Sequence, residues 1–166
     1  MTNVARELLK KQFIELSRDA PSGCSVGLDD DANFFSWRVC FEGPPDTFYE
    51  GGIFQASLKF PPDFPNNPPE MVFEQDMWHP NVFPDGRVCI SILHPPGHDM
   101  FNEQEKAEER WRPILGVEAI LLSVISMLGE PNIESPANVD AANMYKNNLQ
   151  EYKKKVRAIA RKSVEG

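Results

Sequence analysis

Two segments in which apolar and polar residues alternate limit the possible folds of this chain more than any other feature. The apolar positions of the first segment are Phe35, Trp37, Val39 and Phe41, and those of the second are Phe54, Ala56, Leu58 and Phe60. A period of two is typical of a β-strand with one buried face. A third short strand is expected at residues 71–73, and a weaker pattern indicates another at residues 24–28. Because the connections are of hairpin length, we expect an antiparallel meander.

Helical patterns lie on both sides of the strands. Apolar residues at steps of three or four predict an amphipathic helix before residues 20–23, built on Ala5, Leu8, Leu9, Phe13 and Leu16. A strongly apolar helix is expected at residues 117–128, where Gly129 and Pro131 stop it. Asn138 and Asp140 are two candidate caps of a short helix. A final helix is predicted by the stripe Leu149, Tyr152, Val156 and Ile159. This order predicts an α+β fold, in which a four-stranded antiparallel meander has one helix before it and about three after it.

Length and charge narrow the class of protein. The chain has 166 residues without an internal repeat or linker, so a single domain covering residues 1–166 is expected. Its formal net charge of −8 argues against general nucleic-acid binding, which needs a basic face opposite the phosphates. No run approaches the roughly 18 apolar residues of a membrane span. Cys24, Cys40 and Cys89 show no CxxC spacing and cannot all pair, which is typical of a reducing, intracellular compartment.

The periodicity disappears between residues 76 and 113, in a segment that contains all three histidines and Cys89. A loop of this length inside a compact domain usually carries function. A zinc site would use His79, Cys89, His94 and His98, but their gaps match no common structural-zinc spacing. A thiol hydrolase would use His79 or His94 as the base for Cys89, although the usual family signatures are absent. An inert, buried thiol is the default interpretation for the other two cysteines and a weaker one for Cys89.

Short motifs occur in a fixed order along the chain. FPPDFP lies at residues 60–65, HPN at 79–81, DGRVCISIL at 85–93, WRP at 111–113 and EPN at 130–132. The HPN run and the segment around Cys89 resemble the active-site signature of ubiquitin-conjugating enzymes, and the other motifs match that family in the same order. An insertion after Cys89 is similar to that of the acidic-loop subclass, in particular to its G-type members. The resemblance covers nearly the whole chain and implies the α+β fold of this family.

The resemblance implies a transfer reaction that passes through Cys89. The C-terminal carboxyl of ubiquitin would arrive as a thioester on the activating enzyme and move to Cys89, and a lysine amine would then attack it. A thiolate is both a good nucleophile and an adequate leaving group, which suits both steps. ATP is used upstream by the activating enzyme, so neither a cofactor nor a metal is expected. Two alternatives stay open: a conjugating enzyme for another ubiquitin-like modifier, and a non-catalytic ubiquitin-binding module of the same fold, which would lack the cysteine.

Residues near the nucleophile take supporting roles by the same resemblance. Asn81 would donate an amide N–H to the oxyanion of the tetrahedral intermediate, with loop capping as an alternative or additional role. His79, next to Pro80, would be structural rather than a general base, and no carboxylate–histidine pair is evident beside Cys89. Ser135 occupies a position where many members carry an acid near the incoming lysine, and serine cannot deprotonate an amine as a carboxylate does.

The inserted loop is strongly acidic. Residues 99–109 contain one lysine and five acids, namely Asp99, Glu103, Glu105, Glu108 and Glu109. Two interpretations stay open: a solvated loop that maintains solubility, and a loop that positions the lysine of an acceptor ubiquitin near Cys89. By resemblance, the second supports the building of degradation-type polyubiquitin chains.

The resemblance also implies partners, which are ubiquitin, the ubiquitin-activating enzyme, a ring-finger-type ubiquitin ligase and protein substrates. Ligase binding is expected at Arg6, Lys10, Phe64, Asn66, Arg112, Pro113 and Ile114. Asn66 stands where many members carry a bulky apolar residue, which suggests a narrower set of ligases. Leu122 corresponds to a contact with donor ubiquitin or else to a core leucine, and Ser25 lies near the back face of the sheet. The protein is expected to act as a monomer in the cytoplasm, with the nucleus or a ligase at the endoplasmic reticulum surface as further locations.

Overall fold

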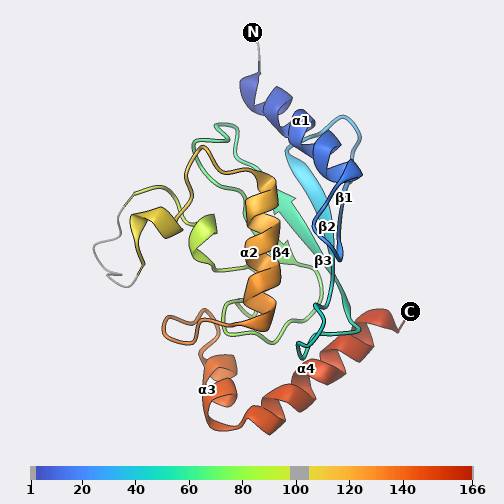
Figure 1. Ribbon diagram of the computed structural model, residues 1–166, viewed down its shortest axis with the longest axis vertical. Coiled ribbons are helices and arrows are strands. Elements are labelled where there is room, and N and C mark those ends of the chain that lie inside the picture. The colour runs from blue at the N-terminus through green and yellow to red at the C-terminus, as the bar shows by residue number, and fades with distance from the viewer. Residues whose placement is uncertain (1–2, 98–104, 166) are drawn as a thin grey trace.

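The computed structural model describes residues 3–97 and 105–165. Helix α1 (Val4–Arg18) is followed by strands β1 (Cys24–Leu28), β2 (Ser36–Glu42), β3 (Ile53–Lys59) and β4 (Glu70–Phe73). Two short 3-10 turns, η1 (Ser91–Leu93) and η2 (Ala107–Glu109), precede helices α2 (Val117–Gly129), α3 (Val139–Asn147) and α4 (Leu149–Val164). Figure 1 shows α1 and α4 at opposite ends of the molecule, with the sheet and α2 between them. The predicted α+β fold is confirmed, with one helix before the strands and three after them.

The four strands form one antiparallel sheet in the order β1-β2-β3-β4, which is a meander. The register pairs Trp37 with Leu58, Val39 with Ala56 and Phe41 with Phe54. All these side chains are buried, because paired residues of neighbouring strands point to the same face. A shift of one residue would move the whole set to the solvent side, so the hydrophobic pattern also determines the register. The weakly marked strand at residues 24–28 is present as β1.

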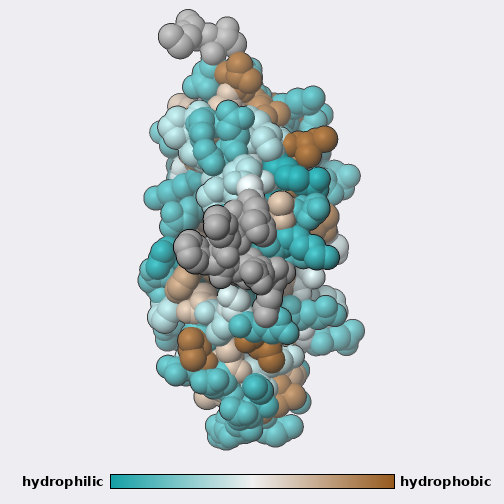
Figure 2. All heavy atoms as spheres, turned by 90° about the vertical axis from the view of Figure 1, so that its left-hand side faces the viewer, coloured by the Kyte–Doolittle hydropathy of each residue, from teal (hydrophilic) through white to brown (hydrophobic). Residues whose placement is uncertain are grey.

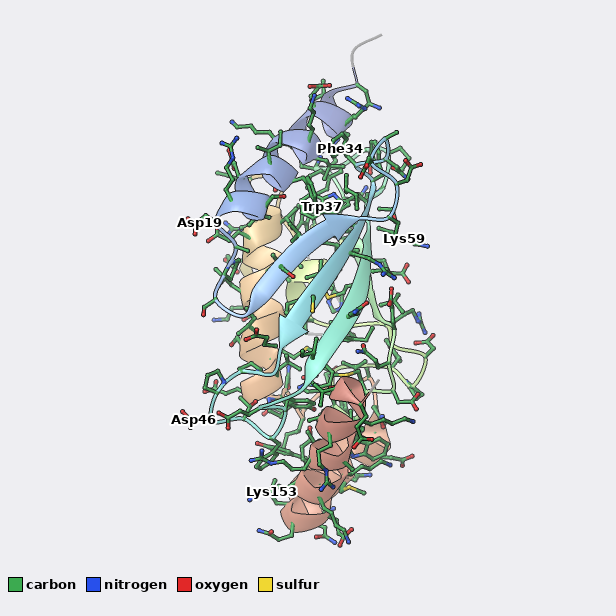
Figure 3. The ribbon with its side chains drawn as sticks, turned by 90° about the vertical axis from the view of Figure 1, so that its right-hand side faces the viewer. Asp19, Phe34, Trp37, Asp46, Lys59 and Lys153 are labelled. Atoms are coloured by element: carbon green, nitrogen blue, oxygen red, sulfur yellow. The ribbon has the colours of Figure 1, made fainter. Side chains whose placement is uncertain are left out.

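Helix α2 covers the buried face of the sheet. Figure 1 shows it to the left of β1, β2 and β3, and Figure 3, viewed from the right-hand side of Figure 1, shows these strands with α2 behind them. Its buried side includes Val117, Ile120, Leu121 and Val124. Burial of one large aliphatic side chain contributes about 1.5–3 kcal/mol, so this layer supplies much of the stability of the core. The helix ends at Gly129, where the sequence predicts its stop.

Helices α1 and α4 close the two ends of the sheet. Figure 3 shows α1 beside Trp37 at one end and α4 at the other. Phe13 of α1 packs edge-on against the Trp37 ring, with 5.2 Å between the ring centroids. Of the stripe predicted for α4, Tyr152 and Val156 are buried, but Leu149 is 44% exposed. Leu149 is the first residue of α4, which begins at the end of the molecule away from the sheet (Figure 1).

Helix α3 begins after Asn138, whose side chain accepts the backbone N–H of Ala141 at 3.0 Å. Of the two candidate caps, Asn138 is therefore the N-cap, and Asp140 lies in the first turn. A side-chain acceptor at this position satisfies an N–H group that the helix itself leaves unpaired. Among residues 3–97 and 105–165, no helix has the length and apolar character needed to cross a membrane.

Candidate active site

His79 is fully buried and joins its own turn to helix α2. Its Nδ1 accepts the backbone N–H of Asn81 at 2.9 Å, so the ring proton is on Nε2, which donates to the carbonyl oxygen of Met127 at 2.7 Å. Burial lowers the pKa of His79 to about 4. A neutral ring with both nitrogens engaged is a structural cross-link and has no free lone pair for a substrate proton.

The peptide groups on either side of His79 are tied to α3 and α4. The carbonyl oxygen of Pro80 accepts the backbone N–H of Asn138, the N-cap of α3, at 3.0 Å. The carbonyl oxygen of Trp78 accepts the hydroxyl of Tyr49 at 2.6 Å and lies 3.5 Å from the hydroxyl of Tyr152 on α4. Three helices therefore contribute to the position of residues 78–81.

Asn81 is buried, and its amide is bound to the backbone of Asn132. Its Nδ2 donates to the carbonyl oxygen of Asn132 at 2.8 Å, and its Oδ1 accepts the N–H of the same residue at 2.9 Å. The role of Asn81 in tying two loops together is thus present in the structure. An amide nitrogen carries two hydrogens, so Nδ2 has a second N–H that the bond to Asn132 does not use. Donation of this N–H to an oxyanion stays a prediction.

Cys89 lies on an irregular segment that runs beside strand β4. Its backbone N–H donates to the carbonyl oxygen of Asn81 at 2.8 Å, and the N–H of Phe73 in β4 donates to the carbonyl oxygen of Gly86 at 2.8 Å. Gly86 has a φ of +99°, and a Cβ atom there would lie 2.4 Å from the carbonyl oxygen of Phe73. Glycine is required for this close approach. The strand and the 79–81 turn therefore hold the cysteine without regular secondary structure of its own.

An open hollow of about 310 Å³ lies beside Cys89. It brings together the predicted site residues Cys89, Asn81, Ser135, Glu105 and Glu109. Glu130 and Glu134, between α2 and α3, add two more carboxylates to its wall. The side of the molecule that carries η1 and η2 faces the viewer in Figure 2 and is mostly hydrophilic. An acidic hollow beside a thiol suits a cationic side chain such as lysine.

Cys89 contacts His94, which the sequence offers as a candidate base, and through it a carboxylate that the sequence does not predict. The Sγ of Cys89 lies 3.5 Å from Nε2 of His94, and Nδ1 of the same ring lies 2.7 Å from Oε2 of Glu105. The expectation that no carboxylate–histidine pair accompanies the cysteine is therefore wrong. Sequence offers only a histidine and an acid in an aperiodic segment, 11 residues apart, and no periodicity places their side chains together.

The acids of the inserted loop differ in their surroundings. Glu105 is only 6% exposed, so its interpretation as part of a solvated acidic surface is wrong. Glu108 and Glu109 are exposed in η2, which agrees with their interpretation as part of a solvated acidic surface. Asp99 and Glu103 lie outside the described residues. Of the three loop carboxylates that the structure describes, those of Glu108 and Glu109 are therefore accessible to a partner, and that of Glu105 is buried beside Cys89.

The residues considered for zinc also differ. His79 has both ring nitrogens bound to backbone groups, and His98 lies outside the described residues. In the part of the chain that the structure describes, no three His, Cys, Asp or Glu side chains gather as metal ligands. His79 is thus a structural residue and no metal ligand in this arrangement.

Comparison with known proteins assigns the chain to a family. A family model described as ubiquitin-conjugating enzyme matches residues 8–160. The chain belongs to the ubiquitin-conjugating enzyme family. It is 54% identical to ubiquitin-conjugating enzyme E2 15 of Schizosaccharomyces pombe, over 99% of this chain and 98% of that relative. It is 46% identical to ubiquitin-conjugating enzyme E2 G2 of Bos taurus, over 99% of both chains.

A solved structure agrees with this assignment. The human ubiquitin-conjugating enzyme E2 G1 matches with a TM-score of 0.68 and 48% sequence identity, over 79% of this chain and 99% of that chain. The resemblance to G-type ubiquitin-conjugating enzymes is thereby confirmed. The protein is a ubiquitin-conjugating enzyme, which transfers ubiquitin through a thioester intermediate.

Most residues predicted to bind a ligase are accessible on the surface of this ubiquitin-conjugating enzyme. They lie on α1 and on two loops, and they are Arg6, Lys10, Asn66, Arg112, Pro113 and Ile114. Ile114 is 86% exposed, although it is large and apolar. The indole Nε1 of Trp111 donates to the carbonyl oxygen of Pro65 at 2.7 Å, which joins the two loops into one surface.

Phe64 is the exception among these residues. Its ring is 2% exposed and packs against Phe60 and Trp111, with centroid distances of 5.0 and 5.7 Å. The side chain therefore supports the loop from beneath and is not available for direct contact. This corrects the sequence prediction for Phe64, whose motif does not reveal which of its apolar residues point inward.

Leu122 and Ser25 lie on other surfaces. Leu122 is 50% exposed on α2, so the alternative of a core leucine is wrong, while its contact with donor ubiquitin stays a prediction. Ser25 is exposed on β1 and pairs in register with Cys40. Because Cys40 alternates with the buried Val39 and Phe41, Ser25 belongs to the face of the sheet opposite α2.

Proposed function

We propose that Cys89 is the residue that carries ubiquitin as a thioester in this enzyme. The observation that supports this assignment is location, because Cys89 lines the acidic hollow whereas Cys24 and Cys40 lie in strands β1 and β2. Burial raises the pKa of Cys24 to about 12, with the neighbouring Cys40 as a smaller cause. A thiol with such a pKa provides almost no thiolate at neutral pH.

Two transfers take place at this thiol. Cys89 first attacks the carboxyl carbon of ubiquitin on the activating enzyme and takes ubiquitin over. The amine of a lysine then attacks the new thioester, and the second N–H of the Asn81 amide donates to the oxyanion that forms. ATP is consumed upstream, so the transfer itself uses no cofactor and no metal. Ser135 lies in the same wall as Glu130 and Glu134, and these carboxylates attract the ammonium group of the incoming lysine.

A ring-finger-type ligase and protein substrates complete the proposed set of partners. The exposed Ile114 and its basic neighbour Arg112 form the centre of the proposed ligase surface. Asn66 replaces a bulky apolar contact there, which favours a narrow set of ligases. The proposed products are degradation-type polyubiquitin chains, built by a monomeric enzyme in the cytoplasm, and a ligase can also recruit the enzyme to the nucleus or the endoplasmic reticulum surface.

The experiment that tests Cys89 is charging with activating enzyme, ATP and ubiquitin, followed by a non-reducing gel. The wild-type protein should gain the mass of one ubiquitin, and thiol reductant should reverse the shift. Cys89→Ser should form an oxyester that resists reductant, because an alkoxide is a poorer leaving group than a thiolate. Cys24→Ser and Cys40→Ser are the matched controls and should charge as the wild type does.

A reducible adduct on Cys89→Ala would contradict the assignment. Charging reactions with other ubiquitin-like modifiers and their activating enzymes test whether the enzyme conjugates one of these modifiers instead of ubiquitin. A faster reaction with one of them than with ubiquitin would favour this alternative. Absence of any adduct with every modifier would favour the non-catalytic binding module.

A further inference from the structure

The hydrogen-bonded chain from Cys89 through His94 to Glu105 has a defined direction. An ionised carboxylate only accepts hydrogen bonds, so Nδ1 of His94 carries the proton and donates it to Oε2 of Glu105 at 2.7 Å. Nε2 therefore presents its lone pair to the Cys89 thiol, 3.5 Å away. A nucleophile, a base and a third group that orients the base form the arrangement by which proteins activate a thiol or hydroxyl.

Glu105 is held by more than the histidine. Its Oε2 also accepts the hydroxyl of Ser91 at 2.7 Å, and its Oε1 lies 3.4 Å from Nε of Arg110. The same Nε donates to the carbonyl oxygen of Pro95 at 2.8 Å, so Arg110 holds both the carboxylate and the residue that follows His94. A buried carboxylate with these partners has one position, and it gives the imidazole ring one orientation.

The backbone of His94 is fixed as well. Its N–H donates to the carbonyl oxygen of Ser91 at 2.9 Å, and its carbonyl oxygen accepts the N–H of Trp111 at 3.0 Å. The half-buried ring lines the hollow beside Cys89, where an acceptor amine has to approach. Apart from Glu105, the charged side chains of residues 3–97 and 105–165 that line this hollow are Glu109, Glu130 and Glu134. A base in such a position can reach both the thiol and the amine that attacks its thioester.

We propose that His94 is a catalytic base for transfer at Cys89 and that Glu105 is its positioning residue; this rests on the proposal that Cys89 carries the thioester. In charging, the thiol proton passes to Nε2 of His94 while sulfur bonds to the carboxyl carbon of ubiquitin. The bond from that carbon to the sulfur of the activating enzyme breaks, and the leaving thiolate takes the proton from Nε2, so that His94 is neutral again.

In discharge, the neutral amine of the acceptor lysine bonds to the same carbon and gives one proton to Nε2 of His94. The bond from the carbon to Cys89 Sγ breaks, and the Cys89 thiolate leaves with the electron pair. His94 then returns its proton to this thiolate, which restores the starting thiol and the neutral ring.

The electrostatics of the site agree with these roles. The hydrogen bond to Cys89 is the largest cause of a pKa of His94 above its ordinary value, and Glu105 raises it further, against a lowering by burial. When Cys89 carries ubiquitin its sulfur belongs to a thioester, so the hydrogen bond that is the largest of these causes is lost. His94 is then neutral over a wider pH range and can accept the proton of the amine.

Single-turnover discharge to free lysine over pH 5.5–9 tests the proposal. Wild-type, His94→Gln and Glu105→Gln proteins are first charged with ubiquitin, and the decay of each purified thioester is followed. The ratio of the wild-type to the variant rate constant cancels the ionisation of the lysine itself. For His94→Gln this ratio should rise with pH, from near 1 to a plateau of about 10²-fold, because general bases contribute about 10²–10⁴-fold.

Glu105→Gln should discharge about tenfold more slowly than the wild type, because a poorly oriented base loses part of its 10²–10⁴-fold effect. The inflection in the pH profile of its discharge rate should lie at lower pH than that of the wild type, because the carboxylate that raises the pKa of His94 is gone. Asp31→Asn removes an exposed carboxylate from the loop between β1 and β2 and serves as the control, with an inflection at the wild-type pH. A slower variant with the wild-type pH profile and a lower melting temperature would instead indicate a purely structural role.

A ratio that does not change with pH would overturn the proposal for His94. If His94→Gln fails to fold, the pH profile of Glu105→Gln still tests the proposal. An inflection at the same pH as in the wild type would contradict it. Formation of a reducible adduct on Cys89 in all variants, together with a flat ratio, would reject this inference and leave the proposed function intact. Failure of Cys89 to form the adduct would reject the proposed function first.

Discussion

His79 stabilises the fold only while its ring is neutral. Burial lowers the pKa of His79 from an ordinary value of 6.5 to about 4. Between these two values the unfolded chain binds a proton that the folded protein does not bind. The contribution of His79 to the free energy of unfolding is therefore lost as the pH falls from 6.5 towards 4.

We predict that His79 alone removes about 2 kcal/mol of unfolding free energy when the pH falls from 7 to 5. The variant His79→Gln should be less stable at pH 7. Between pH 7 and 5 its free energy of unfolding should fall by about 2 kcal/mol less than that of the wild type, because glutamine at position 79 does not bind a proton. Urea denaturation of both proteins at the two pH values measures this difference. Equal losses in the two proteins would contradict a buried, neutral His79.

Asn81 combines a structural role with a predicted catalytic one, and the two have different signatures. We predict that Asn81→Ser charges with ubiquitin at close to the normal rate but discharges to free lysine at least tenfold more slowly. Loss of one oxyanion donor typically costs about 2.7–4 kcal/mol in the barrier. Loss of a structural hydrogen bond costs about 0.5–1.5 kcal/mol of stability. A single-turnover assay and a melting curve on the same preparation measure both effects.

Asn132→Ala is the matched control for Asn81. It keeps the backbone groups that bind the Asn81 amide and removes the side-chain amide, whose oxygen accepts the N–H of Glu134 at 3.0 Å. It should lower the melting temperature with little effect on discharge. A defect in Asn81→Ser no larger than that of Asn132→Ala would leave Asn81 with its structural role alone.

At the scale of elements, the inserted loop has two proposed functions that a deletion would mix. Removal of the whole loop would also remove Glu105, which holds His94. We predict that the double variant Glu108→Gln, Glu109→Gln charges normally but builds free polyubiquitin chains more slowly. Both carboxylates are exposed in η2, and their attraction for an acceptor is screened beyond about 8 Å at physiological salt. Wild-type chain synthesis should therefore weaken as salt is raised, and that of the variant should weaken less.

The control for this prediction removes two exposed acids from another element. Asp30 and Asp31 lie between β1 and β2, and their replacement by Asn changes the net charge by the same amount. This control should build chains at the wild-type rate and with the wild-type salt dependence. If both double variants behave like the wild type, the exposed acids of the loop serve solubility.

Regular elements with a strong period could be predicted from the sequence alone. The alternation in β2 and β3 indicates the strands, their register and their buried face, because one pleated surface must cover the core. The stop of α2 follows from Gly129 and Pro131. The exposure of Leu149 could not be predicted, because periodicity gives the stripe of a helix but not the point at which the helix leaves the core.

At the scale of the whole molecule, one core joins all layers, and α2 provides a direct test of it. Leu121 is 0% exposed and its neighbour Leu122 is 50% exposed. We predict that Leu121→Ala lowers the free energy of unfolding by about 2–5 kcal/mol, whereas Leu122→Ala changes it by less than about 0.5 kcal/mol. Thermal unfolding of the two variants measures this difference.

The same pair separates folding from function. If Leu122 contacts donor ubiquitin, Leu122→Ala should slow the discharge of ubiquitin while its melting curve stays that of the wild type. Comparable destabilisation by the two substitutions would show that α2 is rotated about its axis relative to the arrangement described above.

The site was predictable only where a motif carries it. Cys89, Asn81 and His79 lie within ten residues of one another in a recognisable signature. The partnership of His94 with Glu105 and the inward direction of Phe64 depend on packing between segments without a period. Local sequence does not encode such contacts, because they arise only when the sheet, the helices and the inserted loop come together.

The attachment of the catalytic segment to strand β4 has a consequence for amide hydrogen exchange. Residues 86–89 have no regular structure, yet the N–H of Val88 donates to the carbonyl oxygen of Met71 at 2.9 Å and that of Cys89 to Asn81 at 2.8 Å. Amide protons in loops usually exchange through small local openings, whereas those in core strands wait for large cooperative ones. The amides of Val88 and Cys89 should therefore exchange as slowly as those of the sheet, so the nucleophile belongs to the same cooperative unit as the core.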